Sequence, residues 1–486
     1  MSTKSTSVFD FYGKPSFATA LPLSLQHLLA MIIGNITPAL IVSGVVNGLA
    51  TRTGDASLGA DAAVLVQSAM FIAAIGTLIQ LFPIAIVGSK LPVIMGVSFA
   101  YIPTLSAIGA EYGLPGILGA QIVGAVVGMV VGIFIKPLRK FFPPIVAGTV
   151  VLSIGLSLYT TAVKYIGGGA GLITAANNLK NPESAPAVIE AAQKTLAGGQ
   201  FGDPKFLIVG FVTLLTVLFV GQFGKGMIKL SSILIGIIVG YVVAFAMGMV
   251  SFDAVAAKGW FALPAFGKYN IAFEGPAMMS MAIIFIVNSV QAVGDLSATT
   301  MGGMNREVTD EELQGGIIGS NLGSLVGALF GGLPLATYSQ NVGIVATTKV
   351  VSRFVFMITA IFVLIAGFIP KFGALMTTIP QAVIGGATIG VFASITMSGI
   401  KLIIQDELSN RNTGIVGLAL ALGMGVTSVP ELLANYSPTI KMVFGSSPVT
   451  IATIVAFVLN IIIPKKTLAQ EQQERDEMEA KKAVKK

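Results

Sequence analysis

The 486-residue sequence contains no cysteine, one histidine and one tryptophan. The absence of cysteine excludes disulfide bonds and thiolate metal sites. One histidine cannot supply the paired ligands of a metal-dependent enzyme, and no HExxH pattern occurs, so neither a metal nor a cofactor is expected. Charged residues make up only 10% of the chain, whereas soluble domains carry about 25%. The composition therefore excludes a protein that faces water on all sides.

Hydrophobic residues are abundant instead, at 54% of the chain, and the mean hydropathy is +0.87. Apolar runs of about 20 residues recur, each long enough to cross about 30 Å of hydrocarbon. These runs predict a polytopic membrane protein that is surrounded by a lipid bilayer. The first run, 23–45, is too long for a cleavable signal peptide and contains Gln26 and His27.

The breaks between the apolar runs predict an all-α fold with fourteen membrane spans. The third and tenth are roughly a dozen residues long, too short to cross the bilayer as plain helices. The predicted spans are 23–46, 62–82, 98–110, 115–136, 143–164, 205–223, 229–250, 276–299, 313–332, 339–351, 353–370, 377–399, 412–430 and 448–464.

The basic residues predict the orientation of these spans. If both termini are cytoplasmic, most lysines and arginines fall in cytoplasmic loops, as the positive-inside rule requires. The net charge of +7 is therefore assigned to membrane topology, and no nucleic acid is expected as a partner. We expect the cytoplasmic (inner) membrane as the location and a charged cytoplasmic tail at 465–486.

The two short spans resemble each other. One reads KLPVIMGVSFAYIPTL from Lys90 and the other GLPLATYSQNVGIVAT from Gly332. Each Leu-Pro pair predicts an extended stretch of about six residues before a short helix. Interrupted short spans at matching places in two halves indicate inverted repeats whose half-helices meet at a transporter binding site.

Polar residues near these half-helix starts predict a ligand site. Gln340 and Asn341 begin the tenth span, and Ser98 and Phe99 are expected at the equivalent place in the third. Amide groups, free helix N–H groups and a flat aromatic face suit a small planar polar ring. The alternative is that Ser339 or Asn341 merely caps a helix.

The eighth span carries a second polar group. Asn288, Gln291 and Asp295 are spaced i, i+3 and i+7, so they share one helical face. A charged aspartate at the bilayer centre costs roughly 2.5–3.5 kcal/mol, so Asp295 is interpreted as a proton carrier. The alternative is a structural aspartate bonded to backbone amides. His27, in the first span, is interpreted as a structural hydrogen-bonding residue.

The stretch QNVGIVATTK, from Gln340, fits the pattern [QEP]-N-x-G-x(4)-T-[RKG], in which Gly343 and Thr348 are the fixed glycine and threonine. The chain thereby resembles the nucleobase–ascorbate transporter family, also called nucleobase:cation symporter-2. The resemblance extends over nearly the whole chain. It includes SFAY from Ser98, QAVGD from Gln291, and Gly385-Gly386 in the twelfth span.

The resemblance implies fourteen spans in two inverted seven-span repeats, divided between two domains. The core domain would comprise 1–140 and 276–372, and the gate domain 141–275 and 373–464. Relatives form homodimers through the gate domain. Members take up purines, urate, uracil or ascorbate with H⁺ or Na⁺, and H⁺ is expected here. The expected substrate contacts are Ser98, Phe99, Ala100, Gln291, Gln340 and Asn341, with His27, Asn288, Ser320, Gly343 and Thr348 in supporting positions.

Two residues depart from the family pattern. Gln291 stands where a glutamate is usual, and Ser320 stands where many relatives have an aspartate. A glutamine can bind a ring edge but cannot carry a proton. Asp295 then remains as the titratable group near the site.

We therefore predict a proton-coupled symporter that imports purine bases by alternating access. The alternatives are a uracil, urate or ascorbate transporter of the same family, or an anion transporter of the same fold. An enzyme is not expected, because no nucleophile–base or metal constellation occurs among the spans.

Overall fold

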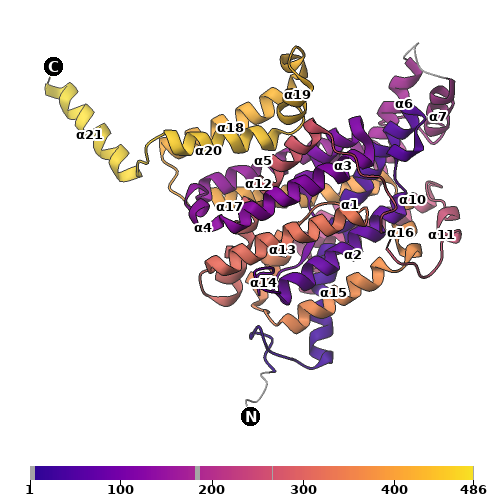
Figure 1. Ribbon diagram of the computed structural model, residues 1–486, viewed down its shortest axis with the longest axis horizontal. Coiled ribbons are helices and arrows are strands. Elements are labelled where there is room, and N and C mark those ends of the chain that lie inside the picture. The colour runs from indigo at the N-terminus through magenta and orange to yellow at the C-terminus, as the bar shows by residue number, and fades with distance from the viewer. Residues whose placement is uncertain (1–5, 181–185, 265, 485–486) are drawn as a thin grey trace.

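The computed structural model of the protein describes residues 6–180, 186–264 and 266–484. Most of the described chain is helical, and the long helices form one bundle (Figure 1). The long helices are α1 (Phe17–Thr53), α2 (Ala62–Leu81), α3 (Ile102–Ile133), α5 (Pro144–Ile166), α8 (Pro204–Phe223), α10 (Ser232–Ala246), α12 (Gly275–Thr299), α13 (Asp310–Leu329), α15 (Arg353–Gly367), α17 (Gln381–Ile403), α18 (Asn410–Ser428) and α20 (Pro448–Ile462).

Shorter elements connect these helices. They are α4 (Ile135–Leu138), α6 (Ala170–Lys180), α7 (Pro186–Leu196), α9 (Met227–Leu230), α11 (Asp253–Ala256), α14 (Ser339–Thr348), α16 (Pro370–Thr377), α19 (Pro438–Gly445) and α21 (Leu468–Val484). Short 3-10 helices also occur, among them η2 (Phe99–Tyr101) directly before α3. The charged tail forms α21, which projects from one end of the bundle, and α11 and α16 lie at the opposite end (Figure 1).

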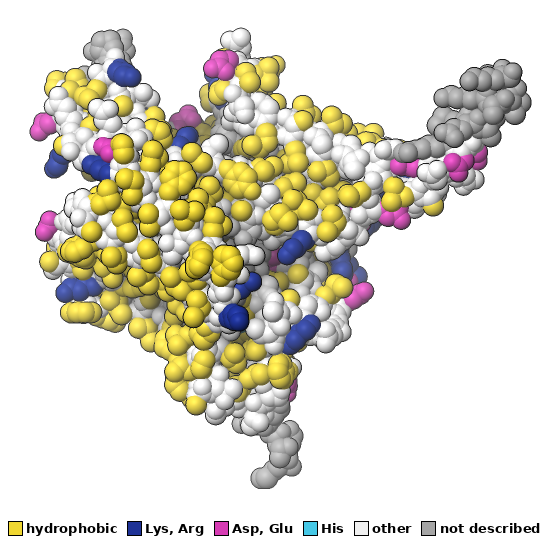
Figure 2. Space-filling model, turned by 180° about the vertical axis from the view of Figure 1, so that it is seen from behind, with side chains coloured by type: hydrophobic (Ala, Val, Ile, Leu, Met, Phe, Trp, Pro, Cys, Tyr) yellow, Lys and Arg dark blue, Asp and Glu magenta, His cyan; other side chains and the backbone are white. Residues whose placement is uncertain are grey.

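The bundle has the length and composition of a multi-pass membrane protein. Within the described residues, seven helices are long and apolar enough to cross a bilayer, or nine if two bent pairs each count as one span. The count of fourteen remains a prediction. Hydrophobic side chains cover much of the rear face (Figure 2). Leu215 and Phe219 of α8 are 62% and 65% exposed. Such a surface is suited to lipid rather than water.

A break at Gly113 separates the predicted third and fourth spans. Helix α3 runs through both of them, but Gly113 has φ 66° and ψ −164°, which is not helical. A β-carbon there would also lie 2.6 Å from the carbonyl oxygen of Leu58. Only glycine tolerates this backbone conformation and this close approach. The short segment before Gly113 is therefore a half-helix that ends where the sequence predicted.

The extended stretches predicted before the two half-helices are present as strands. Strand β1 (Met95–Val97) pairs antiparallel with β2 (Leu335–Thr337), and Gly96 faces Ala336 at the centre. The ladder continues symmetrically, because the Ser98 N–H donates to the Pro334 carbonyl and the Tyr338 N–H to the Ile94 carbonyl, both at 3.0 Å. This local two-fold relation is the arrangement expected of inverted repeats.

The two-stranded ribbon is buried, and side chains satisfy its outer edges. The Val97 N–H donates to Asn35 Oδ1 at 2.7 Å, and the Met95 N–H to Thr77 Oγ1 at 2.9 Å. On the other edge, the Leu335 N–H donates to Ser324 Oγ at 2.9 Å. Open strand edges at membrane depth would otherwise leave backbone groups without partners, which is costly. Polar residues of α1, α2 and α13 therefore make a non-helical backbone tolerable at this depth.

Candidate functional site

The two half-helices start beside each other, at the ends of the ribbon. A small cavity of about 30 Å³ lies between these starts and the helices around them. Residues from α12 and α14 line it on one side, and residues from α5 and α17 on the other. The lining residues are Ser98, Phe99, Ala100, Val151, Ile154, Gln291, Ala336, Thr337, Tyr338, Ser339, Gln340, Ile395 and Ser398.

Five of the six residues predicted to contact the substrate line this cavity. These are Ser98, Phe99, Ala100, Gln291 and Gln340. The sixth, Asn341, is directed elsewhere: it is 1% exposed, and its Nδ2 lies 3.1 Å from His27 Nδ1 and donates to the His27 carbonyl at 3.0 Å. The motif asparagine thus ties α14 to α1.

The predicted equivalence of the two half-helix starts is wrong by two residues. With Gly96 opposite Ala336, Ser98 corresponds to Tyr338 and Ala100 to Gln340. Counting from the two Leu-Pro pairs had instead matched Ser98 with Gln340. The difference arises because a turn, in which the Val93 N–H donates to the Leu91 carbonyl, adds two residues before β1.

Asp295 is joined to the start of α14 through two hydroxyl groups. Thr337 Oγ1 donates to Asp295 Oδ2 at 2.7 Å, and Ser339 Oγ donates to Oδ1 at 2.8 Å. The carboxyl group is buried next to the cavity rather than in its lining. A hydroxyl can donate to a carboxylate and can also accept from a carboxylic acid. The two hydroxyl groups therefore suit both protonation states of Asp295. Backbone amide N–H groups would not, because they can only donate.

These contacts also decide the capping alternative. Helix α14 begins after Tyr338, which makes no side-chain cap. Ser339 occupies the first helical position, and its hydroxyl donates a hydrogen bond to Asp295. The Asn341 side chain is hydrogen-bonded to His27. Neither residue is the cap that the alternative required. The first N–H groups of an α-helix have no acceptor within the helix, and two of the residues that carry them in α14, Ser339 and Gln340, line the cavity.

Gln291 and Gln340 are the amide side chains of the cavity. Among the described residues, Gln291 Oε1 is buried without a hydrogen-bond partner, and so is Asn288 Oδ1 one turn earlier. A buried acceptor without a donor is costly and rare in native proteins. A ligand that presents an N–H edge would remove that cost at Gln291, which lines the cavity.

Phe99 forms the aromatic wall. Its ring is 5% exposed and packs edge-on against Phe392 of α17, with ring centroids 5.1 Å apart. Its place in the cavity lining leaves it able to contact a planar ring.

The other supporting residues lie around the site. The His27 ring packs against the Phe356 ring, with ring centroids 4.4 Å apart. Ser320 Oγ donates to the Leu335 carbonyl of β2 at 3.3 Å. Thr348 Oγ1 donates to the Ile344 carbonyl at the end of α14. A β-carbon at Gly343 would have no atom within 4 Å. His27, Ser320 and Thr348 thus have identifiable structural contacts, whereas Asn288 Oδ1 is buried without a hydrogen-bond partner among the described residues.

Sequence reasoning missed several residues of the site. Thr337 and Ser339 bind Asp295, and Ser339 had been considered only as a cap. The wall formed by Val151, Ile154 and Ile395 was not foreseen, because apolar residues in apolar spans carry no distinguishing pattern. Ser398, in the predicted twelfth span, is the one polar residue among the cavity-lining residues of α5 and α17, and so the one that the sequence could have indicated.

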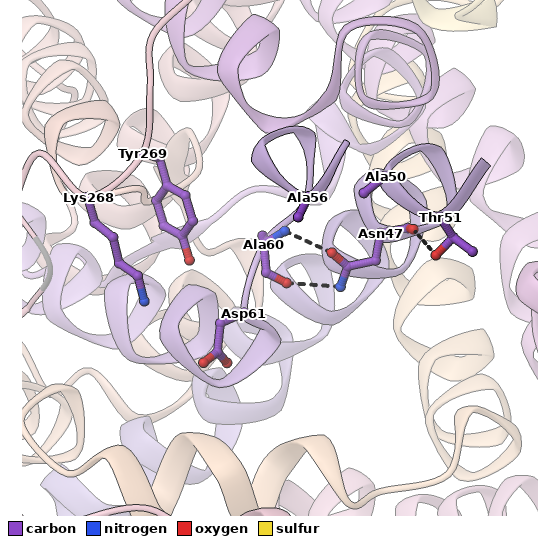
Figure 3. Close-up of a pocket in the computed structure, with 9 residues that line it drawn as sticks. Asn47, Ala50, Thr51, Ala56, Ala60, Asp61, Lys268 and Tyr269 are labelled. Atoms are coloured by element: carbon purple, nitrogen blue, oxygen red, sulfur yellow. Dashed lines mark hydrogen bonds between the residues drawn. The ribbon is translucent and has the colours of Figure 1, made fainter. Parts of the chain in front are cut away.

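A larger, open cleft of about 350 Å³ lies elsewhere, between the end of α1, the start of α2 and residues 268–269 (Figure 3). Two of its polar side chains already have hydrogen-bond or ion-pair partners. Asn47 exchanges two hydrogen bonds with the Ala60 backbone, at 2.8 and 2.9 Å, and Asp61 pairs with Lys258 at 2.7 Å. None of the predicted site residues lines this cleft, so we assign the functional site to the central cavity.

Comparison with known proteins identifies the family of the chain. The sequence pattern of the Permease family matches residues 18–189 and 183–432. The chain belongs to this family. The resemblance drawn from the motif is thereby confirmed, and this permease is a multi-pass membrane transport protein and not an enzyme.

Two relatives illustrate the similarity. The permease is 34% identical over 472 residues to the xanthine permease XanQ of Escherichia coli (strain K12), covering 94% of each chain. It is 32% identical over 449 residues to the uric acid permease PucK of Bacillus subtilis (strain 168), covering 91% of this chain and 95% of that one.

A solved structure shows the same fold. The murine Slc26a9 anion transporter in the inward-facing state superposes with a TM-score of 0.54, over 91% of this chain and 68% of that one. Sequence identity is 13%, so the likeness concerns the fold alone.

Proposed function

We propose that this permease is a proton-coupled symporter that imports purine nucleobases across the cytoplasmic membrane by alternating access. The observation that carries the proposal is the cavity in which Phe99, Gln291 and Gln340 come together beside the hydroxyl-bonded Asp295. The relatives XanQ and PucK are named as permeases of two oxopurines, xanthine and uric acid.

The base would be bound by stacking and by edge recognition. Phe99 offers a ring face, which attracts a planar heterocycle. Gln291 and Gln340 each carry an acceptor and a donor group, which match the mixed N–H and C=O edges of an oxopurine. Free N–H groups at the start of α14 would donate hydrogen bonds to the remaining carbonyl oxygen of the base.

Asp295 would carry the co-transported H⁺, in preference to Na⁺. Thr337 and Ser339, the hydrogen-bond partners of Asp295, also line the cavity. Protonation of Asp295 therefore changes whether the hydroxyl hydrogens of Thr337 and Ser339 are free to turn towards the substrate. Proton binding and base binding are thereby linked through two hydroxyl groups. Linkage of this kind is reciprocal, so a bound base would in turn favour the protonated carboxyl group.

Alternating access would involve relative motion of the two walls of the cavity, one formed by α12 and α14 and the other by α5 and α17. The cavity of about 30 Å³ holds a few water molecules and not a purine, so the walls must separate for a base to enter. Val151 and Ile154 of α5, with Ile395 and Ser398 of α17, belong to the proposed gate domain. The core domain, with α3, α12 and α14, would move against them. A homodimer held by the gate domains would keep that wall stationary.

A competition experiment tests the substrate class. Radiolabelled xanthine uptake is measured in cells that lack their own permeases, with purines, uracil and ascorbate as competitors. We expect purines to compete at least tenfold better than uracil or ascorbate. Equal competition by uracil would contradict the purine assignment, and inhibition by bicarbonate or chloride alone would favour an anion transporter of the same fold.

Substitution of Asp295 tests the coupling. Asp295→Asn retains the shape and can still bond Thr337 and Ser339, but it cannot titrate. We expect pH-driven accumulation of the base to be lost while binding of the base remains measurable. Asp253→Asn, at the exposed start of α11, is the matched control and should transport normally. Full proton-driven uptake by Asp295→Asn would place the proton carrier elsewhere.

A further inference from the structure

The connection between α11 and α12 exposes a group of large apolar side chains. We call this group the strap patch, which consists of Trp260, Phe261, Leu263 and Phe266. They are 73%, 70%, 71% and 68% exposed, respectively. Single exposed apolar residues are ordinary, but four within seven positions require an explanation.

The backbone around the strap patch is fixed to the helices beneath it. The Ala262 N–H donates to the Phe368 carbonyl at 3.1 Å, and Gln67 Nε2 of α2 donates to the Ala262 carbonyl at 3.1 Å. Further along, the Gly267 N–H donates to the Leu329 carbonyl at 2.9 Å and the Ala272 N–H to the Pro115 carbonyl at 3.0 Å. The patch is therefore held in place by α2, α3, α13 and α15.

The strap patch continues the apolar surface of a membrane-spanning helix. Ile361 and Ile365 on α15 are 41% and 50% exposed, as lipid-facing residues are. At the end of this helix, Phe368 stacks on Phe261, with ring centroids 5.8 Å apart and an interplanar angle of 19°. The strap patch therefore meets the end of α15 through Phe261 and Phe368. The neighbouring helices α11 and α16 lie at the end of the bundle opposite α21 (Figure 1).

The chemistry of this region is that of a membrane–water boundary. Trp260 is the single tryptophan of the chain, and Lys371 Nζ lies 4.7 Å above its ring centroid. Lys268 lies next to the patch, with its Nζ 5.6 Å from the Tyr269 ring centroid. Tryptophan is enriched where acyl chains meet headgroups, and lysine there directs its ammonium group towards phosphates.

We propose that the strap patch is inserted in the headgroup–acyl boundary of the leaflet opposite α21, so that Trp260 anchors the surrounding helices at the membrane surface. The partner is the phospholipid bilayer itself. The apolar rings replace contact with water by contact with acyl chains, while Lys371 and Lys268 face the phosphate layer. This proposal does not depend on which substrate the cavity binds.

The single tryptophan allows a direct test in the intact protein. Intrinsic fluorescence is measured in phospholipid vesicles whose lipids carry bromine either near the glycerol backbone or near the chain ends, and with iodide in the water. We expect shallow bromines to quench Trp260 at least twofold more than deep bromines, with weak quenching by iodide.

Two reference variants calibrate the measurement, each made on the Trp260→Phe background. Leu215→Trp places the fluorophore at an exposed position midway along α8, where deep bromines should quench most. Ala469→Trp places it at an exposed position on α21, where iodide should dominate. Quenching of Trp260 by iodide alone, as for Ala469→Trp, would overturn the proposal in favour of an aqueous loop. Protection from both quenchers would overturn it in favour of a protein partner, such as a second copy of the chain.

Discussion

At the residue scale, Gly96 and Tyr338 show how closely the two strands of the ribbon are fitted. A β-carbon on Gly96 would lie 2.4 Å from Tyr338 Cζ, and the Tyr338 hydroxyl donates to the Val97 carbonyl at 2.8 Å. The tyrosine ring thus lies directly over the glycine, and its hydroxyl links the start of α14 to β1.

We therefore expect Gly96→Ala to destabilise the protein by about 1–3 kcal/mol, the usual cost of overpacking. Thermal unfolding in detergent measures the effect. Gly343→Ala is the matched control, since a β-carbon there meets no atom of the described residues within 4 Å. Its stability should not fall below that of the parent, because alanine favours the helix α14 more than glycine does. Stability of Gly96→Ala equal to that of the parent would show that the ribbon can relax around Tyr338.

The two cavity amides give a second prediction at this scale. Gln291→Ala and Gln340→Ala each remove a hydrogen-bonding group from the cavity lining, which should weaken base binding by about 1–3 kcal/mol, or roughly 5- to 150-fold in Kd. Equilibrium binding to the purified protein measures this loss. Gln405→Ala, at an exposed position after α17, should bind normally. Unchanged Kd in both cavity variants would mean that the base binds elsewhere.

At the element scale, the start of α13 depends on a charged cap. Thr309 and Glu312 form a capping box, and Arg306 contacts Glu312 at 2.5 and 2.8 Å. Partial burial opposes ionisation of Glu312, but the hydrogen bonds from Arg306 and the Thr309 amide outweigh it and lower the pKa of this carboxyl group. Its folded-state pKa is thus below its unfolded value.

This shift has a defined pH dependence. A depressed carboxyl pKa contributes stability above the unfolded pKa, and the contribution disappears as pH falls through the folded pKa. Glu312→Gln should therefore lower stability by about 0.5–1 kcal/mol at pH 7, because glutamine keeps the capping box but not the ion pair. The difference from the parent should vanish in acid. Thermal unfolding as a function of pH checks this, and a difference that persists in acid would point to lost packing instead.

Elements were predictable from the sequence to different degrees. The Leu-Pro pairs and the Gly113 break located both half-helices, because proline and glycine restrict the backbone wherever they occur. The register between the half-helices was misjudged, since the turn at Leu91–Val93 has no sequence signature. The partners of Asp295 were missed for a related reason: hydroxyl groups are common in membrane helices, and only the fold shows which ones converge.

At the scale of the whole molecule, the cavity lies between helices that belong to different proposed domains. A chain without cysteine allows this arrangement to be tested with single introduced thiols. Ser398 lines the cavity from α17, so Ser398→Cys should react with a water-soluble thiol reagent when the walls separate.

We expect saturating purine to slow this labelling at least threefold, because a bound base occupies the same space. The rate is measured by mass shift in vesicles. Asn435→Cys, at an exposed position before α19, should be labelled at one rate with or without purine. If Ser398→Cys were labelled at the same rate with and without purine, a site between the two walls would be contradicted.

The buried ribbon has a consequence for energetics. Backbone bonds join β1 to β2, and Asn35, Thr77 and Ser324 hold the outer edges, so the two half-helix starts form one rigid unit. Under the proposed mechanism, a base carried by a rigid unit meets the same binding groups on either side of the membrane. Its intrinsic affinity would then be equal inside and outside. Whatever the affinity on each side, binding supplies no net free energy over a transport cycle and so cannot concentrate the base. Net accumulation would have to come from the co-transported ion, through Asp295.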